Sequence, residues 1–225
     1  RKPMPEILAL LQNIAPVVSA TLLQQMSHVI YGMLISTGRI TMLEISRWTE
    51  RGGSYRTLQR WYSSKLVWLQ VMWILFTSQL WKAGHEYIAA GDEVVFGKAG
   101  KETHGVGYFF SGLQQRVLPG LSFFVFSLID VQERQSYPIQ VAQMVKQAGE
   151  KTQKAKAKPA KGKRPVGRPK GSKNKKDEKP SLSPELLRIQ PVLQAFLAVL
   201  ASVLSIHYLV MDGHFGNYPS AWMIR

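Results

Sequence analysis

Apolar residues in the first third of the chain recur with the period of an α-helix. The stretches 20–35 and 65–80 repeat apolar side chains three and four positions apart, and short connections containing glycine interrupt this pattern. Such spacing predicts amphipathic or buried helices rather than strands. Residues 1–84 are therefore expected to form a helical region.

Two shorter helices are predicted between these stretches. Thr41 and Glu44 have the spacing of a capping box, which predicts a helix that begins near Thr41. Ser54 follows a pair of glycines and can cap the next helix. The polar face of that helix could meet DNA as in a helix-turn-helix motif, although a helical hairpin with a solvated basic face explains the pattern equally well. Its candidate DNA-binding residues are Arg56, Gln59 and Arg60.

From residue 85 onwards the pattern becomes typical of β-strands. The segments 87–96, 105–112 and 121–131 are rich in β-branched and aromatic residues, and a turn with two glycines follows the first of them. Short strands in succession predict a meander. We therefore expect residues 85–145 to contain three strands.

A basic insert interrupts the ordered pattern. Residues 146–183 consist mainly of Ala, Gly, Pro and Lys without apolar periodicity, which predicts disorder in the free protein. Residues 184–225 should be ordered again, with a helix from Ser183 to about Leu204 and a strand over 206–212. The order of helices, strands, insert, helix and strand predicts a mixed α/β fold.

Composition narrows the class of protein. With 225 residues of which 45% are hydrophobic, the chain can bury a sizeable core. It contains no cysteine, which excludes disulfides and zinc knuckles and favours a cytoplasmic protein. Residues 192–211 carry no formal charge, but a buried helix followed by a buried strand explains them better than a membrane span does. We expect no membrane association.

The charge points to a polyanionic partner. Of the net charge of +15, +11 lies between Lys146 and Lys179, where 14 residues are basic and three are acidic. The slim, extended Gly-Arg-Pro sequence at 167–169 could enter the narrow minor groove of A·T-rich DNA, while the neighbouring lysine side chains contact phosphates. This segment resembles an AT-hook, with a generic basic linker as the alternative. Its candidate DNA-binding residues are Arg164, Arg168, Lys170 and Lys173.

Two aspartates stand at or near the ends of apolar segments that we predict to be strands. An unpaired carboxylate is costly to bury, and a metal ion would remove that cost. Strand alternation places Asp92 on the face of Ala90 and Asp212 on the face of Val210. If the two strands are neighbours, both carboxylates could bind one Mg²⁺ and begin a two-metal site. The alternative is that each aspartate simply ends a strand and begins a turn.

Six short motifs lie at 38–43, 52–60, 91–95, 97–105, 119–124 and 212–217. Together they resemble the motifs of bacterial insertion-sequence transposases of the DDE type. This resemblance implies a ribonuclease H-like catalytic domain, in which three strands, a helix and a fourth strand follow one another. It also implies that Asp92 and Asp212 correspond to the first two catalytic carboxylates, on the first strand and at the end of the fourth.

The same resemblance implies a chemistry and a set of partners. In such enzymes the carboxylates hold Mg²⁺ or Mn²⁺, water attacks a phosphodiester at the transposon end, and the freed 3′-hydroxyl attacks target DNA. The N-terminal helices would bind the terminal inverted repeats. We accordingly expect a homodimer in the active complex and a bacterial, nucleoid-associated protein of the cytoplasm.

One feature departs from the family pattern. The family's third carboxylate is a Glu on a helix after the second Asp, yet no Asp or Glu follows Asp212. We therefore expect a fragment with an incomplete ribonuclease H-like domain that is inactive alone. The alternative is a non-catalytic DNA-binding protein that favours A·T-rich sites, or a truncated transposase that acts as an inhibitor.

Overall fold

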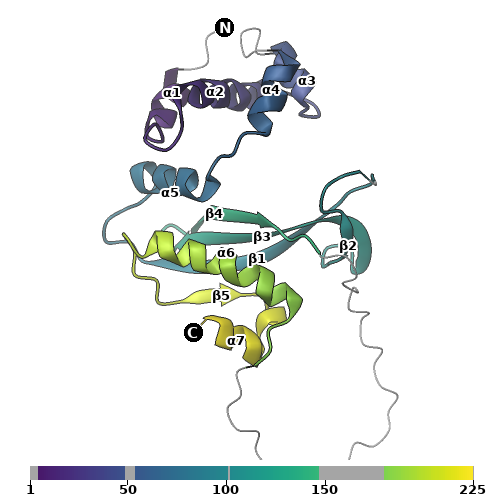
Figure 1. Cartoon of the computed structure of the whole chain (residues 1–225). Helices are drawn as coiled ribbons and strands as arrows, with labels where there is room; N and C mark the ends of the chain where they lie inside the picture. Colours follow the sequence, from purple (N-terminus) through teal and green to yellow (C-terminus); the bar gives the residue numbers. More distant parts are fainter. Residues whose placement is uncertain (1–4, 49–53, 101, 147–179, 225) are drawn as a thin grey trace, which may run out of the picture. The chain divides into compact units, whose positions relative to one another are not determined.

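The computed structural model describes residues 5–48, 54–100, 102–146 and 180–224 (Figure 1). This part of the chain forms a mixed α/β fold of seven α-helices, one short 3₁₀ helix and five strands. The predicted basic insert falls almost entirely outside these ranges. The AT-hook-like segment and its candidate residues therefore lie outside the described residues: Arg164, Arg168, Lys170 and Lys173.

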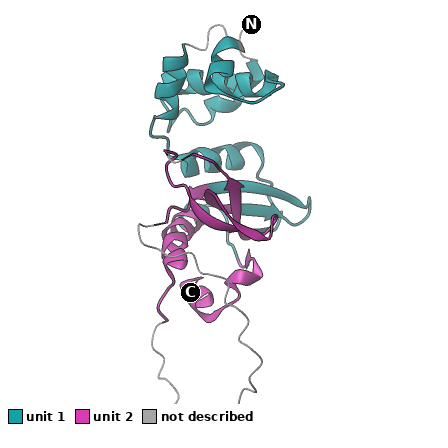
Figure 2. Ribbon diagram, turned by 90° about the vertical axis from the view of Figure 1, so that its right-hand side faces the viewer, with its two compact units in different colours: residues 1–88, 127–140, 198–206 teal, residues 89–126, 141–197, 207–225 magenta. Residues whose placement is uncertain are grey.

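The chain divides into two compact units (Figure 2). Unit 1 comprises residues 1–88, 127–140 and 198–206. Unit 2 comprises residues 89–126, 141–197 and 207–225. Both units are assembled from segments that are far apart in the sequence.

Five helices of unit 1 arise from the periodic apolar pattern. Their inward positions form one hydrophobic core that includes Leu11, Val29, Ile45 and Leu58. Because each apolar stripe is buried only against its neighbours, packing rather than helix propensity stabilises these short helices. The helices are α1 (Pro5–Gln12), α2 (Ala20–Ile35), α3 (Met42–Trp48), α4 (Tyr55–Tyr62) and α5 (Trp68–Gln79).

The helix starts that the sequence predicts are confirmed, with one change in the capping. The backbone N–H of Glu44 donates to Oγ1 of Thr41 at 3.1 Å, as the capping box requires. Ser54 occupies the N-cap of α4 with extended backbone, but its hydroxyl makes no capping hydrogen bond there. That hydroxyl lies 3.4 Å from Oγ1 of Thr57 instead.

Unit 1 also contains a cluster of aromatic rings around Phe76 of α5. Phe76 lies edge-on to Tyr87, with ring centroids 5.6 Å apart, and its centroid is 5.5 Å from that of Tyr137. The backbone N–H of Lys82 donates to the Tyr87 hydroxyl at 3.0 Å, and the Lys82 ammonium pairs with Glu133. These contacts fix the chain where it leaves α5 and enters the first strand.

The five strands form a mixed sheet in the order β2-β3-β1-β5, with β4 paired to β3 as well. Strands β1 and β5 are parallel, and strands β2 and β3 are antiparallel. Backbone hydrogen bonds from Lys98 to Pro119 and from Val131 to Glu86 join opposite ends of β1 and β3, so this pair is also antiparallel. The strands are β1 (Tyr87–Gly97), β2 (Gly107–Ser111), β3 (Arg116–Asp130), β4 (Gln135–Gln143) and β5 (Leu209–Met211).

The structure has four strands between residues 85 and 145, where the sequence predicted three. The additional strand is β4, which follows β3 after a tight turn in which Arg134 has a φ of 55°. The Asp130 carboxylate accepts the backbone N–H groups of Gln132 and Glu133 and so closes this turn. Polar residues and Pro138 within β4 obscured the alternating pattern.

One face of the sheet in unit 2 is covered by α6 (Pro184–Leu200). The Phe126 and Phe196 rings stack with centroids 5.1 Å apart, and both are fully buried. The helix stays continuous through Pro191, and in Figure 1 it is drawn in front of the strands. Among the described residues, no helix has the length and apolarity that crossing a membrane would require.

The opposite face of the same strands carries exposed apolar side chains. Phe96 and Val210 are each more than half exposed, and Tyr108 and Phe110 in β2 are similarly open. Asp92 and Asp212 are exposed as well. This uncovered face is therefore the one on which any ligand of the two aspartates would bind.

Candidate active site

The register of β1 and β5 brings Asp92 and Asp212 to neighbouring positions. These parallel strands pair Ala90 with Val210 and Gly91 with Met211. Asp92 and Asp212 are the residues that directly follow this last pair, and the backbone of Asp212 has φ −55° and ψ 152°. Paired positions in a parallel sheet share a face, and neighbouring strands lie about 4.8 Å apart. The register of these adjacent strands therefore brings the backbone positions of the two aspartates near each other.

Gly91 allows the first strand to lie directly over an aromatic cluster. A Cβ atom at this buried position would lie 2.9 Å from Cε1 of Phe126 and 3.0 Å from Cε1 of Phe124. Real Cβ atoms do not approach other atoms so closely, so the position requires glycine. Because side chains alternate along a strand, Asp92 then points to the opposite, exposed face.

The same aromatic cluster anchors the segment that follows Asp212. Phe215 is buried, and its ring lies edge-on to Phe124 with centroids 5.7 Å apart. Its backbone N–H donates to the carbonyl oxygen of Asp212 at 2.8 Å, within the 3₁₀ helix η1 (Gly213–Phe215). Phe124 therefore contacts the segments that carry both aspartates.

The two carboxylates have few hydrogen bonds of their own. Oδ1 of Asp92 accepts the backbone N–H of Glu93 at 2.8 Å. In the described part of the chain, the Asp212 side chain makes no capping hydrogen bond to η1. Each carboxylate therefore keeps oxygen atoms that are available to a ligand.

Glu93 does not join this pair. Strand alternation turns it toward the covered face, where its carboxylate accepts the hydroxyl of buried Ser122. Elsewhere in unit 2, His214 Nε2 lies 3.2 Å from Oε2 of Glu185 at the start of α6. Over residues 5–48, 54–100, 102–146 and 180–224, no three His, Asp or Glu residues gather in a metal-binding cluster. The site thus consists of two carboxylates.

The structure leaves the three candidate DNA-binding residues of α4 open to solvent. Arg56, Gln59 and Arg60 are exposed, whereas Leu58 and Trp61 of the same helix are buried in the core. These five positions separate into two faces as the helical period predicts. Among the described residues of unit 1, the side chains of the polar face are therefore accessible to solvent.

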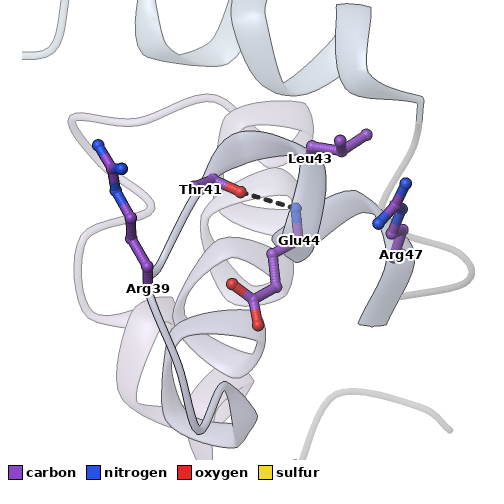
Figure 3. Close-up of a pocket in the computed structure, with 5 residues that line it drawn as sticks. All are labelled: Arg39, Thr41, Leu43, Glu44 and Arg47. Carbon is purple, nitrogen blue, oxygen red and sulfur yellow. Dashed lines mark hydrogen bonds between the residues drawn. The ribbon is translucent and has the colours of Figure 1, made fainter.

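Sequence reasoning missed a pocket beside α3. Figure 3 shows that Arg39 and Arg47 lie on either side of it, with Glu44 between them. Two features of the sequence could have indicated this pocket: the capping box at Thr41, and the arginines that precede and follow it. The residues that line the pocket are Arg39, Thr41, Leu43, Glu44 and Arg47.

Comparison with known families assigns the class of protein. Residues 14–225 match the family described as DDE superfamily endonuclease. Since this match covers nearly the whole chain, the protein belongs to that family, and the resemblance to DDE-type transposases is confirmed. Membership makes DNA the substrate and phosphodiester cleavage the general activity. No curated protein and no solved structure gave a significant match.

Proposed function

We propose that the protein is an insertion-sequence transposase that uses Asp92 and Asp212 to hold divalent metal ions at the DNA strand to be cut. The observation that carries this proposal is the parallel register of β1 and β5, whose last pair, Gly91 and Met211, directly precedes the two aspartates. Family membership supports DNA cleavage, and the register supports these residues as its centre.

The two side chains fit a divalent metal ion chemically. Like charges at paired strand positions repel, and a cation between them would offset that repulsion. Mg²⁺ is commonly held by one or two carboxylates together with substrate phosphates, so Asp92 and Asp212 form a suitable minimal set. When bound, Mg²⁺ or Mn²⁺ would stabilise the negative charge that develops on the attacking and leaving oxygens.

The proposed reaction has two stages. In the first, a water oxygen bonds to phosphorus at the transposon end while a phosphorus–oxygen bond of the backbone breaks, which leaves a 3′-hydroxyl. In the second, this hydroxyl attacks a phosphodiester of target DNA and displaces its leaving oxygen. The uncovered sheet face around Asp92 and Asp212 gives DNA access to the two carboxylates.

DNA would be held by groups outside this centre. Arg56, Gln59 and Arg60 are proposed to contact the terminal inverted repeats, and their exposure on one face of α4 supports this role. The basic segment, with Arg164 and Arg168 at its centre, is proposed to contact A·T-rich minor grooves. The active complex is proposed to be a homodimer on nucleoid DNA in the bacterial cytoplasm, which light scattering of the DNA-bound protein would test.

The decisive experiment measures Mg²⁺-dependent nicking of transposon-end DNA by the purified protein. Asp92→Asn and Asp212→Asn should each abolish nicking and strand transfer while DNA binding persists. Glu102→Gln is the matched control, because Glu102 is exposed in the same unit and lies outside the pair. Retained nicking in either aspartate variant would remove the metal assignment.

A second candidate function is DNA binding without catalysis, as in a repressor or an inhibitor of transposition. A net charge of +11 in one segment favours this non-catalytic function. So does the lack of a third acidic ligand near Asp92 and Asp212 within the described residues. Deletion of residues 163–176 should then abolish most salt-sensitive, A·T-favouring binding. Metal-dependent nicking by the unmodified protein would rule this candidate out.

A further inference from the structure

Two aromatic side chains of unit 2 lie on the uncovered face of the sheet, along the strand that carries Asp92. Phe96 is 57% exposed, and its ring lies edge-on to that of Phe123, with centroids 6.0 Å apart. Exposure alternates along β1, so Asp92, Val94 and Phe96 share one face. Phe96 and Phe123, which we call the aromatic pair, therefore stand on the same face as the first aspartate.

The pairing of β1 with β3 fixes the position of the aromatic pair. The backbone N–H of Lys98 donates to the carbonyl oxygen of Pro119 at 3.1 Å. A Cβ atom on Gly120 would lie 2.3 Å from the carbonyl oxygen of Phe96, so only glycine lets β3 approach β1 so closely. Phe96 is thus held by a paired strand rather than by a loop. At a rise of about 3.3 Å per residue, it lies about 13 Å along β1 from Asp92.

The chemistry of this face favours a nucleobase as the ligand of the aromatic pair. Asp92 and Asp212 repel phosphate groups unless a cation lies between them, and a phenyl ring offers a phosphate no hydrogen bond. A base instead presents a π-face, and its stacking on an aromatic side chain tolerates any sequence. Nucleotides in a stacked strand follow one another at about 3.4 Å. A base within about four positions of a phosphate held at Asp92 would therefore reach Phe96.

We propose that Phe96 and Phe123 form a stacking platform for an unpaired base close to the phosphodiester that the protein cuts. This inference rests on the proposed function, because it takes Asp92 and Asp212 as the centre of cleavage. It adds a neutral contact to the substrate that is independent of sequence. Because the face of a base is accessible only when the base leaves the stack of the duplex, the platform would favour a locally opened strand.

The first test maps this contact directly. The whole chain, without added metal, is irradiated in complex with a 12-nucleotide oligothymidine strand that carries 5-iodouracil, a base analogue that crosslinks to aromatic side chains stacked on it. Crosslinked peptides identified by mass spectrometry should contain Phe96 or Phe123. Phe110 is the internal control, because it is 55% exposed but belongs to β2.

The second test compares matched variants in their binding of the same strand, measured by fluorescence anisotropy. Phe96→Leu keeps an apolar side chain but removes the ring, and should weaken binding about tenfold through the loss of one base stack. The slope of log affinity against log salt should not change, because a neutral ring releases no counterions. Phe96→Trp retains an aromatic ring, and Phe110→Leu removes one outside the platform, so both should bind as the unmodified chain does.

The outcomes separate the platform from the proposed cleavage. Crosslinks confined to other residues, or equal binding by Phe96→Leu and Phe110→Leu, would overturn the platform even if nicking depends on both aspartates. An effect of Phe96→Leu on the sedimentation of the DNA-free protein alone would also overturn it, since Phe96 would then lie between two copies of the chain. Crosslinking at Phe96 in a protein that does not nick DNA would instead refute the cleavage and leave the base contact standing.

Discussion

Gly91 lies so close to Phe126 that a Cβ atom on the glycine would be 2.9 Å from Cε1 of the ring. Phe126 in turn stacks on Phe196 of α6, so the ring cannot retreat without disturbing the core. The strand that carries Asp92 is therefore seated directly on the aromatic cluster. Any side chain at residue 91 should lift this strand from its support.

We predict that Gly91→Ala destabilises the protein by overpacking. Inserting a methyl group into a packed core costs about 1–3 kcal/mol, and urea unfolding monitored by circular dichroism would measure the loss. Gly112→Ala is the control, since a Cβ atom there meets nothing within 4 Å and the backbone φ is not left-handed. Equal stability of the two variants would contradict the close packing at Gly91.

A second prediction concerns Phe124, which contacts both segments of the candidate site. Phe124→Ala should cost about 3–5 kcal/mol, because it leaves a cavity beside Gly91 and Phe215. It should also weaken Mn²⁺ binding, since both aspartates lose their common support. Phe110→Ala removes a ring of the same size that is more than half exposed, and should change neither property appreciably.

Asp130 gives a prediction about stability at acid pH. Burial alone would raise the pKa of this carboxyl, but the backbone N–H groups of Glu133 and Gln132 and the side chain of His85 lower it below its usual value. His85 Nδ1 lies 2.7 Å from Oδ2 of Asp130. A lowered pKa means that ionised Asp130 stabilises the fold above its ordinary pKa of about 3.9, and this contribution is lost as pH falls through the folded-state pKa.

Asp130→Asn should therefore destabilise the protein at pH 6, and the difference from the unmodified chain should shrink as the pH falls from about 5 to below 3. Urea midpoints measured across this range provide the test. Glu102→Gln, at an exposed position, should show no such convergence. A constant difference between Asp130→Asn and the unmodified chain would argue that the hydrogen bonds do not depend on charge.

Much of the arrangement could be predicted from local patterns. The period of two along β1 was enough to place Asp92 on the face opposite buried Gly91, and the burial of this part of the strand alternates accordingly. The helix start at Thr41 followed from the capping box, which is a contact between residues three apart. Such features depend on neighbouring residues, so the sequence contains them directly.

Other features depend on contacts between distant residues. The roles of Gly91 and Phe215 follow from their packing against Phe124, which no local pattern indicates. Strand β4 escaped prediction because its pairing with β3 stabilises a polar sequence that looks like a loop. The pocket between Arg39 and Arg47 likewise depends on how α3 is held by the core.

The last prediction tests whether Asp92 and Asp212 act on the same ion. If both carboxylates bind one cation, removing either should abolish most of the Mn²⁺ affinity, and removing the second should add little. Isothermal titration of Asp92→Asn, Asp212→Asn and the double variant would complete this cycle, with Glu102→Gln as the control. Separate binding by each aspartate would instead give losses that add. Because the last pair of the parallel register directly precedes the two aspartates, strongly non-additive losses are expected.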